Sequence, residues 1–305
     1  MLKYIMILGH YNLKGIIIMK KFISVLLAVM FVLSLAACGS KPAAPAAPAA
    51  PVTYVELKED LGAEEYGVGF RKEDIAFGLE VQKTLDAMIA DGKAAEISNK
   101  WFGTDALLKD KDFIKESAAP ADDKSLEAIK SKGKFVVGLD DSYPPMGFRN
   151  DKNEIVGFDI DLAKEVASRL GVEVEFQPID WDSKELELNS GKIDCIWNGM
   201  TITPERIENM FFAKPYIANQ QIIIVPSNSG ITTKAQLEGK TIGLQKGSSS
   251  LDALNADPIS KKVKEVVEYP DNVAAYMDLQ AGRIDVFVVD SVVGRYVISQ
   301  NASNK

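Results

Sequence analysis

Gly191-Lys-Ile-Asp-Cys-Ile-Trp-Asn-Gly-Met-Thr-Ile-Thr-Pro-Glu-Arg206 is the stretch from which most of the fold can be inferred. Its apolar run contains Cys195, which we therefore expect to be a buried structural thiol. Its Thr-Pro-Glu segment is typical of a helix start, and this places Arg206 in the first helical turn. An arginine in such a position is by default a solvated surface residue, so its function must be judged from the rest of the chain.

Around this stretch, short β-branched runs alternate with helical segments, which predicts an α/β fold. The runs cover residues 135–138, 172–176, 221–225, 241–244 and 286–289, and a helical pattern covers 158–170. Residues 72–101, rich in Ala, Leu, Glu and Lys, predict a single helix with Trp101 as a packing residue near its end. About 250 residues follow the N-terminal region, which is enough for one large or two moderate lobes with proper cores.

The N-terminal region predicts secretion and lipid anchoring. Lys20 and Lys21 precede an uncharged run that ends in Leu-Ala-Ala-Cys38, the pattern of a signal peptide with a lipoprotein cleavage site. We expect Cys38 to carry the lipid; an ordinary signal peptide or a membrane helix is the alternative. Met19 is the more natural start, and the prolines of residues 38–52 predict a semi-rigid stalk.

Composition excludes several classes of function. Residues 1–37 contain four of the 35 basic side chains and none of the 43 acidic ones, so the rest of the chain carries a formal net charge of −12. Nucleic acid is therefore not an expected partner. His10 is the only histidine, and Cys195 is the only cysteine besides Cys38. An intrachain disulfide, a His-based triad and a His/Cys metal site are thus excluded, and we expect no metal and no cofactor.

Four segments occur in the order typical of one family. They are residues 138–148 with 157–162, 180–182, 191–206 and 237–290. In these segments the chain resembles the bacterial extracellular solute-binding proteins of family 3, the substrate-binding lipoproteins of ABC importers for polar and basic amino acids. The resemblance implies a two-lobed α/β fold of the type II periplasmic-binding-protein kind, in which two strands cross between the lobes as a hinge.

The same resemblance implies a site for the backbone groups of a free amino acid. Arg206 would bind the α-carboxylate with its guanidinium fork. Ser248 and Ser249 would add donors from the other lobe at a helix start, although the same residues could simply cap that helix. The carbonyl of Gly199, the hydroxyl of Thr201 and the carboxylate of Asp290 would accept the α-ammonium, and Asp290 alone could equally be a helix cap.

The side chain of the ligand would lie between Tyr143 and Trp181. Asp140, with Asp141 and Glu185 nearby, would make this end of the pocket negative, which favours arginine or lysine; polar neutral and cystine-type ligands use much of the same frame. The complete set of expected ligand-binding residues is Asp140, Tyr143, Trp181, Asn198, Gly199, Thr201, Arg206, Gln245, Ser248, Ser249 and Asp290.

The order of the segments is unusual, because residues 53–118 resemble the closing part of the family and residues 124–303 its start and middle. We therefore expect a circular permutant. Recombination between tandem copies, or two fragments that swap with another chain, is the rival explanation. The expected parts are residues 1–37 as leader, 38–52 as stalk, 53–62 as the last strand of the second lobe, 63–118 and 124–217 as the first lobe, 119–123 as the joining linker, and 218–305 as the second lobe.

These predictions together describe a binding protein rather than an enzyme. The expected protein is a monomer, lipid-anchored outside the membrane of a Gram-positive cell, that closes around an L-amino acid and is recognised by the membrane permease of an ABC importer. A dehydratase or lyase on the same scaffold and a tethered sensor without a role in transport are the alternatives.

Overall fold

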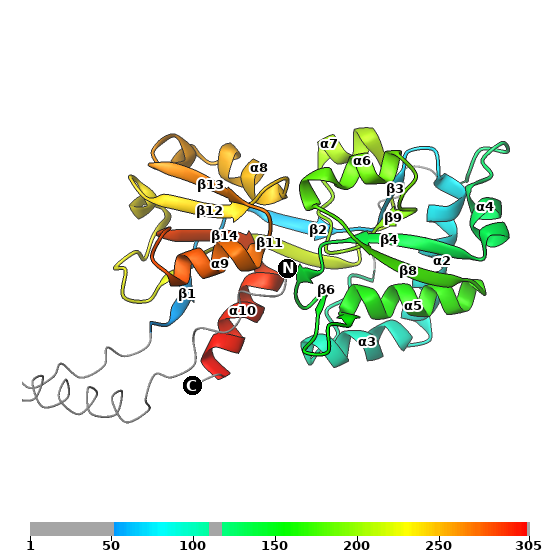
Figure 1. The fold of residues 1–305 in the computed structure, drawn as a ribbon, viewed down its shortest axis with the longest axis horizontal. Helices are drawn as coiled ribbons and strands as arrows, with labels where there is room; N and C mark the ends of the chain where they lie inside the picture. Colours follow the sequence, from blue (N-terminus) through cyan, green and yellow to red (C-terminus); the bar gives the residue numbers. More distant parts are fainter. Residues whose placement is uncertain (1–51, 110–117, 304–305) are drawn as a thin grey trace, which may run out of the picture. The chain divides into compact units, whose positions relative to one another are not determined.

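A computed structural model describes residues 52–109 and 118–303 of the chain. The predicted leader, Cys38 and nearly all of the predicted stalk lie outside the described residues. Within the described ranges, no helix is both long and apolar enough to cross a membrane. The described chain folds into two α/β lobes (Figure 1).

The first lobe is built on a five-stranded sheet in the order β10-β3-β9-β4-β8. β4 is parallel to β8 and to β9, whereas β3 is antiparallel to β9 and β10. A small sheet, β5-β6-β7, lies beside it. The elements of this lobe are β3 (Gly69–Arg71), α2 (Ile75–Ala90), α3 (Lys93–Phe102), α4 (Ser125–Lys132), β4 (Lys134–Leu139), β5 (Ser142–Tyr143), β6 (Gly147–Arg149), β7 (Ile155–Val156), α5 (Phe158–Leu170), β8 (Glu173–Pro178), α6 (Lys184–Asn189), β9 (Cys195–Ile196), α7 (Pro204–Asn209) and β10 (Met210–Phe212).

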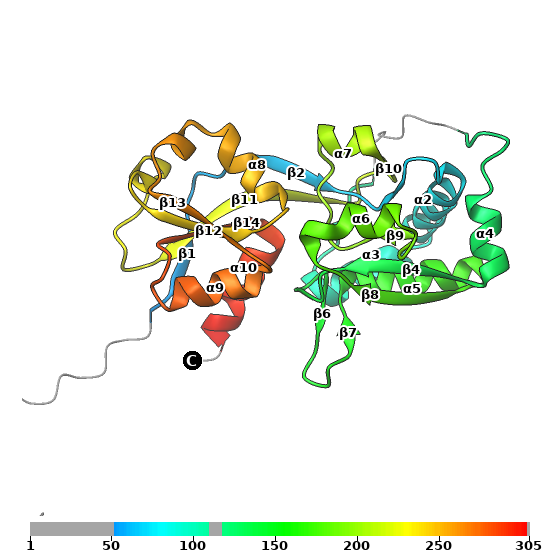
Figure 2. The same cartoon turned by 45° about the horizontal axis from the view of Figure 1, so that its top comes forward.

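The second lobe is built on the order β1-β11-β14-β12-β13, with β2 also paired to β11. Its elements are β1 (Tyr54–Glu56), β2 (Ala63–Tyr66), β11 (Ile217–Pro226), β12 (Thr241–Gln245), α8 (Ser249–Ala256), β13 (Glu265–Tyr269), α9 (Asn272–Gln280), β14 (Val286–Asp290) and α10 (Ser291–Ser303). β2 pairs with residues 217–220 and leads into β3, while β11 follows β10. These two antiparallel strands therefore carry the chain between the lobes (Figure 2).

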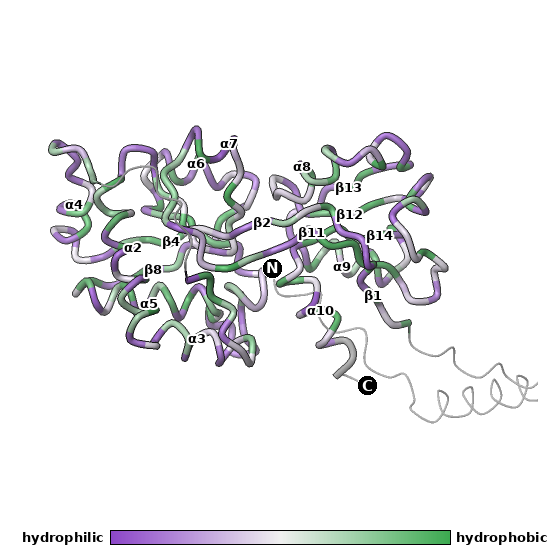
Figure 3. The backbone as a smooth tube through the Cα atoms, turned by 180° about the vertical axis from the view of Figure 1, so that it is seen from behind, coloured by the Kyte–Doolittle hydropathy of each residue, from purple (hydrophilic) through white to green (hydrophobic). Residues whose placement is uncertain are grey.

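Segments far apart in the sequence share the core of the first lobe. Phe77 of α2 packs against Phe70 of β3 at a ring-centroid distance of 5.3 Å and against Phe135 of β4 at 5.5 Å, and all three rings are fully buried. Hydrophobic stretches follow the central strands in Figure 3, whereas the peripheral loops are largely hydrophilic. Cys195 is buried and free, as predicted.

The predicted helix over residues 72–101 is two helices. Gly92 adopts a left-handed conformation with φ of 84°, which ends one helix and starts the next, so α2 and α3 replace the single helix. Trp101 does pack as predicted: its ring meets Phe148 edge-on at 5.9 Å, and its Nε1 donates to Asp161 at 2.8 Å.

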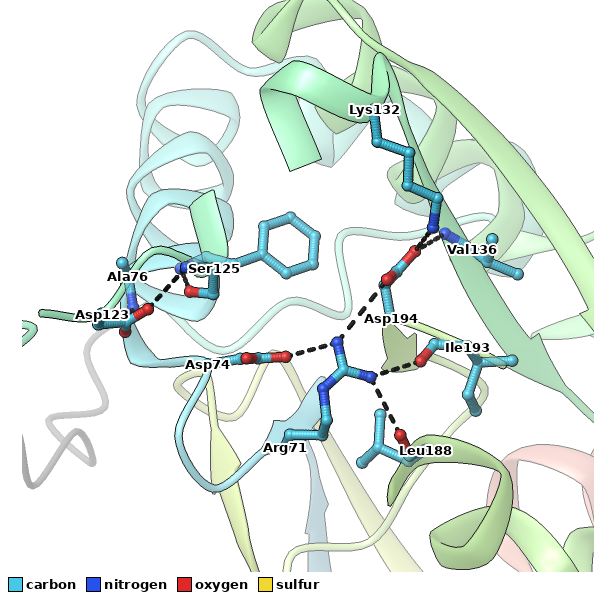
Figure 4. A network of polar contacts seen from close by, with 11 residues as sticks. Arg71, Asp74, Ala76, Asp123, Ser125, Lys132, Val136, Leu188, Ile193 and Asp194 are labelled. Carbon is cyan, nitrogen blue, oxygen red and sulfur yellow. Dashed lines mark hydrogen bonds and ion pairs between the residues drawn. The ribbon is translucent and has the colours of Figure 1, made fainter. Parts of the chain in front are cut away.

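A polar network joins residues 71–77 to later parts of the first lobe (Figure 4). Nη1 of Arg71 donates to the carbonyls of Leu188 and Ile193 at 3.0 and 2.7 Å, and Nη2 pairs with Asp74 at 2.6 Å. Nη2 also lies 3.7 Å from Asp194, which accepts from Lys132 and from the amide of Val136. Arg71 thus ties β3 to the ends of α6 and β9.

The first turn of α2 is capped by residues that follow it by almost 50 positions. Asp123 accepts the amide of Ala76 at 2.6 Å and Ser125 accepts the amide of Phe77 at 3.1 Å. Asp74, the residue before the helix, makes no such bond and pairs with Arg71 instead. The helix start is therefore satisfied only when both segments are in place.

Arg71→Ala should lower the free energy of unfolding by about 2 kcal/mol, because two partly buried carbonyls lose their charged donor. Arg283→Ala is the control: Arg283 also pairs with an aspartate, Asp278, but its side chain is 62% exposed, so the unfolding midpoint should hardly change. Urea unfolding of both variants is the measurement. Equal stability losses would contradict the role given to Arg71.

Candidate ligand-binding site

One small cavity brings together nine of the eleven predicted ligand-binding residues. Its free volume is only about 10 Å³, and it is lined by Tyr143, Trp181, Gly199, Thr201, Arg206, Gln245, Ser248, Ser249 and Asp290. The first five belong to the first lobe and the last four to the second. Asp140 and Asn198 lie beside the cavity and do not line it; both are buried, and the amide of Asp140 donates to Asn198 Oδ1 at 3.1 Å.

Sheet topology explains why these residues meet. Asp140 follows β4, Gly199 and Thr201 follow β9, Gln245 ends β12 and Asp290 ends β14. All four strands run parallel to a neighbour in their sheet. Ligands of open α/β sheets bind beyond the carboxyl ends of such strands, and here the carboxyl ends of both sheets contribute to one cavity.

Arg206 is buried at the cavity wall, with 7% of the residue exposed. Thr203 caps α7 by accepting the amide of Arg206 at 3.2 Å, and Pro204 occupies the first helical position. The guanidinium donates to the carbonyl of Thr201 at 2.8 Å and to that of Gly247 at 3.3 Å. Two of its five N–H groups are thus used by carbonyls, and burial lowers its pKa.

Lys184 is a second buried cation in this region, and sequence reasoning missed it. Its Nζ donates to the carbonyl of Gly247 at 2.9 Å and to that of Trp181 at 3.2 Å, so the ammonium reaches the same carbonyl as Arg206. Burial lowers the pKa of Lys184 to about 8. Nothing in its sequence neighbourhood, a Lys-Glu pair at a helix start, indicates burial.

At the start of α8 the structure shows the helix-capping role expected of its serines, and their contact with a ligand carboxylate stays a prediction. Ser248 caps the helix by accepting the amide of Ser250 at 3.3 Å, and its own hydroxyl donates to the carbonyl of Gln245 at 2.7 Å. The hydroxyl of Ser249 lies 3.1 Å from that of Thr201 in the other lobe. Ser248 is therefore a helix cap in this structure, and Ser249 faces the opposite wall.

Asp290 is buried on the second-lobe side of the cavity, and it accepts several hydrogen bonds. Its Oδ1 accepts hydrogen bonds from the hydroxyl of Tyr66 at 2.8 Å and from the side-chain amides of Asn219 at 2.5 Å and Gln221 at 3.1 Å. Burial, followed by the nearby charge of Glu64, raises the pKa of Asp290 to about 6. An ammonium group near this carboxylate would favour its ionised form.

Gly199 is held in place by Asp159 and by two tyrosines. Its amide donates to Asp159 Oδ2 at 2.7 Å, and burial raises the pKa of this carboxyl to about 7. The φ angle of Gly199 is 57°, and a Cβ there would lie 2.7 Å from Tyr143 and 3.1 Å from Tyr66. The backbone at this wall of the cavity therefore requires glycine.

At the end of the cavity predicted to be negative, Asp140 bridges the lobes. It accepts from the amide and hydroxyl of Ser142 at 2.9 and 2.6 Å and from Gln245 of the second lobe at 2.7 Å, and burial raises its pKa. Asp141 is not part of this group, because it pairs with Arg149 at 2.5 Å. Glu185 lies near Arg206 and Lys184 instead, where burial lowers the pKa of both side chains and the charge of Glu185 offsets part of that lowering.

The lobes touch around Gly247. Lys246 forms an ion pair with Asp182 at 2.8 Å, next to the bonds that Arg206 and Lys184 make to the carbonyl of Gly247. A Cβ on Gly247 would lie 2.8 Å from the Cα of Asp182. The described arrangement therefore has the two lobes in direct contact across the cavity.

Comparison with known proteins identifies the family. The sequence model of the bacterial extracellular solute-binding proteins, family 3, matches residues 135–269. An ABC uptake transporter substrate-binding protein from Streptococcus pneumoniae, solved with bound histidine, is 38% identical with a TM-score of 0.58 over 60% of this chain and 76% of that one. The chain belongs to this family.

Two curated relatives are similar over part of their length. The L-cystine-binding protein TcyJ of Escherichia coli (strain K12) is 35% identical over 172 residues, which are 56% of this chain and 64% of that protein. The arginine-binding extracellular protein ArtP of Bacillus subtilis (strain 168) is 30% identical over 171 residues, 56% of this chain and 66% of that one. The chain thus spans slightly less than two thirds of these curated relatives.

The match to the solute-binding family covers most, but not all, of the cavity. Residues from Tyr143 to Ser249 lie inside the matched range, whereas Asp290 and the strand β2 with Tyr66 lie outside it. Among the described residues no group of three or more Cys, Asp and Glu side chains is placed to hold a metal ion.

Gly247→Ala should separate the lobes, because the new methyl group would meet the backbone of Asp182. Gly230→Ala is the matched control: Gly230 has a similar φ of 75°, against 68° at Gly247, but an added Cβ has nothing within 4 Å. Both variants acquire backbone strain, and only the first should increase the radius of gyration in small-angle X-ray scattering. An equal radius in both variants would rule out contact at Gly247 as a determinant of closure.

Asp290→Asn should remove a pH-dependent contribution to stability. Because the folded pKa of about 6 exceeds the usual value of 3.8, the unfolded state releases its proton first as pH rises. The Asp290 contribution to the wild-type stability should therefore decline between about pH 4 and 6 and stay constant above. Urea unfolding at several pH values should show this decline in the difference between the unfolding free energies of wild type and variant. A difference that does not change with pH would contradict it.

Proposed function

We propose that this protein is the substrate-binding component of an amino-acid ABC importer and binds one free L-amino acid in the described cavity. The observation that carries the proposal is the placement of Arg206 and Asp290 on the same small cavity, in different lobes. A zwitterion needs a donor fork for its carboxylate and an acceptor for its ammonium, and these two residues are the matching groups. Thr201 and the Gly199 segment, next to them, would supply further acceptors.

We further propose a basic amino acid, arginine or lysine, as the ligand. Asp140 lies beside the cavity and accepts hydrogen bonds from Ser142 and Gln245, which are neutral donors. Tyr143 and Trp181 supply aromatic faces on which a guanidinium or an aliphatic stem can pack. The names of similar proteins mention arginine, histidine and cystine. Histidine and cystine are therefore the alternative ligands to test.

Binding in this proposal works by closure of the lobes. The ligand would contact Arg206 and Thr201 in the first lobe and Ser249 and Asp290 in the second, and its contacts to both would favour the closed arrangement. A membrane permease would then recognise the closed form. No covalent step is involved. Arg206 for the carboxylate of the ligand and Asp290 for its ammonium are both present, and this pair favours a binding protein over a dehydratase or lyase.

The remaining expectations from the sequence are proposals as well. Lipidation of Cys38, a stalk over residues 38–52 and an extracytoplasmic location suit a tethered binding protein. We also propose that the chain is a circular permutant in which residues 67–109 and 124–216 together make the first lobe; the expected boundaries at 63 and 217 fall in β2 and β11, which pair in the sheet of the second lobe. The position of β3 between β9 and β10, and the capping of α2 by Asp123, support this.

A thermal-shift screen with L-arginine, L-lysine, L-histidine and L-cystine tests the function. A ligand at 100 times its dissociation constant should add roughly 2.7 kcal/mol of stability. We expect the melting temperature to rise with arginine or lysine and Arg206→Ala to abolish the rise. A rise with cystine or histidine alone would replace the basic ligand and keep the function.

Other outcomes of the same screen would reject separate parts of the proposal. A cooperative melt that none of the four amino acids moves would reject the importer function. Two separate melting transitions would reject the permutant, because its segments share one core. Turnover of a cyclohexadienyl acid by the purified protein would favour the enzyme alternative.

A further inference from the structure

The hinge strand β2 carries an acidic side chain, Glu64, that reaches into the contact between the lobes. One oxygen, Oε2, accepts the hydroxyl of Thr201 at 3.0 Å and the hydroxyl of Ser249 at 3.2 Å. It also accepts the side-chain amides of Asn219 at 3.0 Å and Gln221 at 2.9 Å. A single atom on the hinge thus lies within hydrogen-bond distance of donors from the first lobe, the second lobe and β11.

The position of Glu64 is fixed by backbone pairing on both sides. Residue 64 lies opposite Asn219 in the β2–β11 register. On the other side, Tyr66 forms a β-bridge with Thr201, and the amide of Ile202 donates to the carbonyl of Glu65 at 2.9 Å. The carboxylate and the Thr201 hydroxyl are therefore held together by the main chain and not only by their own hydrogen bond.

Hydrogen-bond chemistry then determines what Thr201 can offer to a ligand. An ionised carboxylate only accepts, and a hydroxyl has one proton and two lone pairs. When the Thr201 proton points at Glu64, the lone pairs of the hydroxyl are left as acceptors. An α-ammonium needs acceptors, so this orientation favours it.

Glu64 also adds charge beside Asp290. The amides of Asn219 and Gln221 each donate to both carboxylates, which places the two acids around the same pair of donors. Burial and, after it, the charge of Glu64 raise the pKa of Asp290. A cation bound near both groups would relieve their repulsion.

We propose that Glu64 is a positioning residue of the ammonium site: it orients the hydroxyls of Thr201 and Ser249 and, together with Asp290, provides the negative charge that a ligand's α-ammonium requires. This inference rests on the proposed function. It places one of the determinants of affinity on the hinge itself, outside the segment that matches the family model.

Glu64→Gln tests this inference, because it keeps the shape of the side chain and replaces an acceptor-only group by an amide. Isothermal titration with L-arginine, L-lysine, L-histidine and L-cystine should show binding of the preferred amino acid weakened about 10- to 100-fold, as expected for a lost charged hydrogen bond. Glu65→Gln removes the same charge one position along β2, does not alter the cavity lining, and should stay within about twofold of wild type.

A double-mutant cycle separates positioning from a general structural effect. If Glu64 acts through Thr201, then Glu64→Gln in a Thr201→Val background should weaken binding much less than it does alone. Full additivity, or an equal loss in Glu65→Gln, would overturn the proposal. If the glutamine variant does not melt cooperatively, Glu64→Asp, which keeps the charge but shortens the reach, replaces it with the same expectations.

The outcomes also distinguish this inference from the proposed function. Wild-type protein that binds none of the four amino acids would reject the function and this inference with it. If wild-type protein and Glu64→Gln bind one of the amino acids with the same affinity, the role of Glu64 is rejected and the proposed function is kept.

Discussion

Strand β11 pairs along its whole length with strands from distant parts of the chain. Its first half pairs with β2, and its second half pairs with β1 and with β14. Because the chain enters β11 from the first lobe and leaves it inside the second, these backbone hydrogen bonds connect the two sheets. Asn219 and Gln221 on this strand donate to Asp290, so the same pairing also positions the acidic side of the cavity.

The cavity concentrates buried charge of both signs. Arg206 and Lys184 converge on the carbonyl of Gly247, while Asp290 is surrounded by amides and by Tyr66. Burial lowers the pKa of the two cations and raises that of the acid, so each charged form is less stable here than in water. A zwitterionic ligand would compensate charges on both sides, which gives binding a physical reason to stabilise contact between the lobes.

The proposed permutation is compatible with this physics because the hinge and the core depend on spatial neighbours and not on chain order. Phe77 packs against Phe70 and Phe135, and Asp123 caps α2, although these residues come from different segments. In the proposed arrangement the stalk would enter through the second lobe, on β1, whereas the hinge strands and the cavity would keep the same neighbours.

The sequence by itself determined the α/β class, the buried thiol of Cys195 and the helix start before Arg206, because these follow from periodicity and local capping chemistry. The family motifs also indicated all nine residues that line the cavity. Only the tertiary structure revealed Lys184 and Glu64, whose charged side chains look like ordinary surface residues until packing shows what covers them. It also gave Asp123 the capping role, since a contact across almost 50 residues depends on how distant segments fold together, and it divided the helix over residues 72–101 at Gly92, where the backbone takes a local left-handed turn.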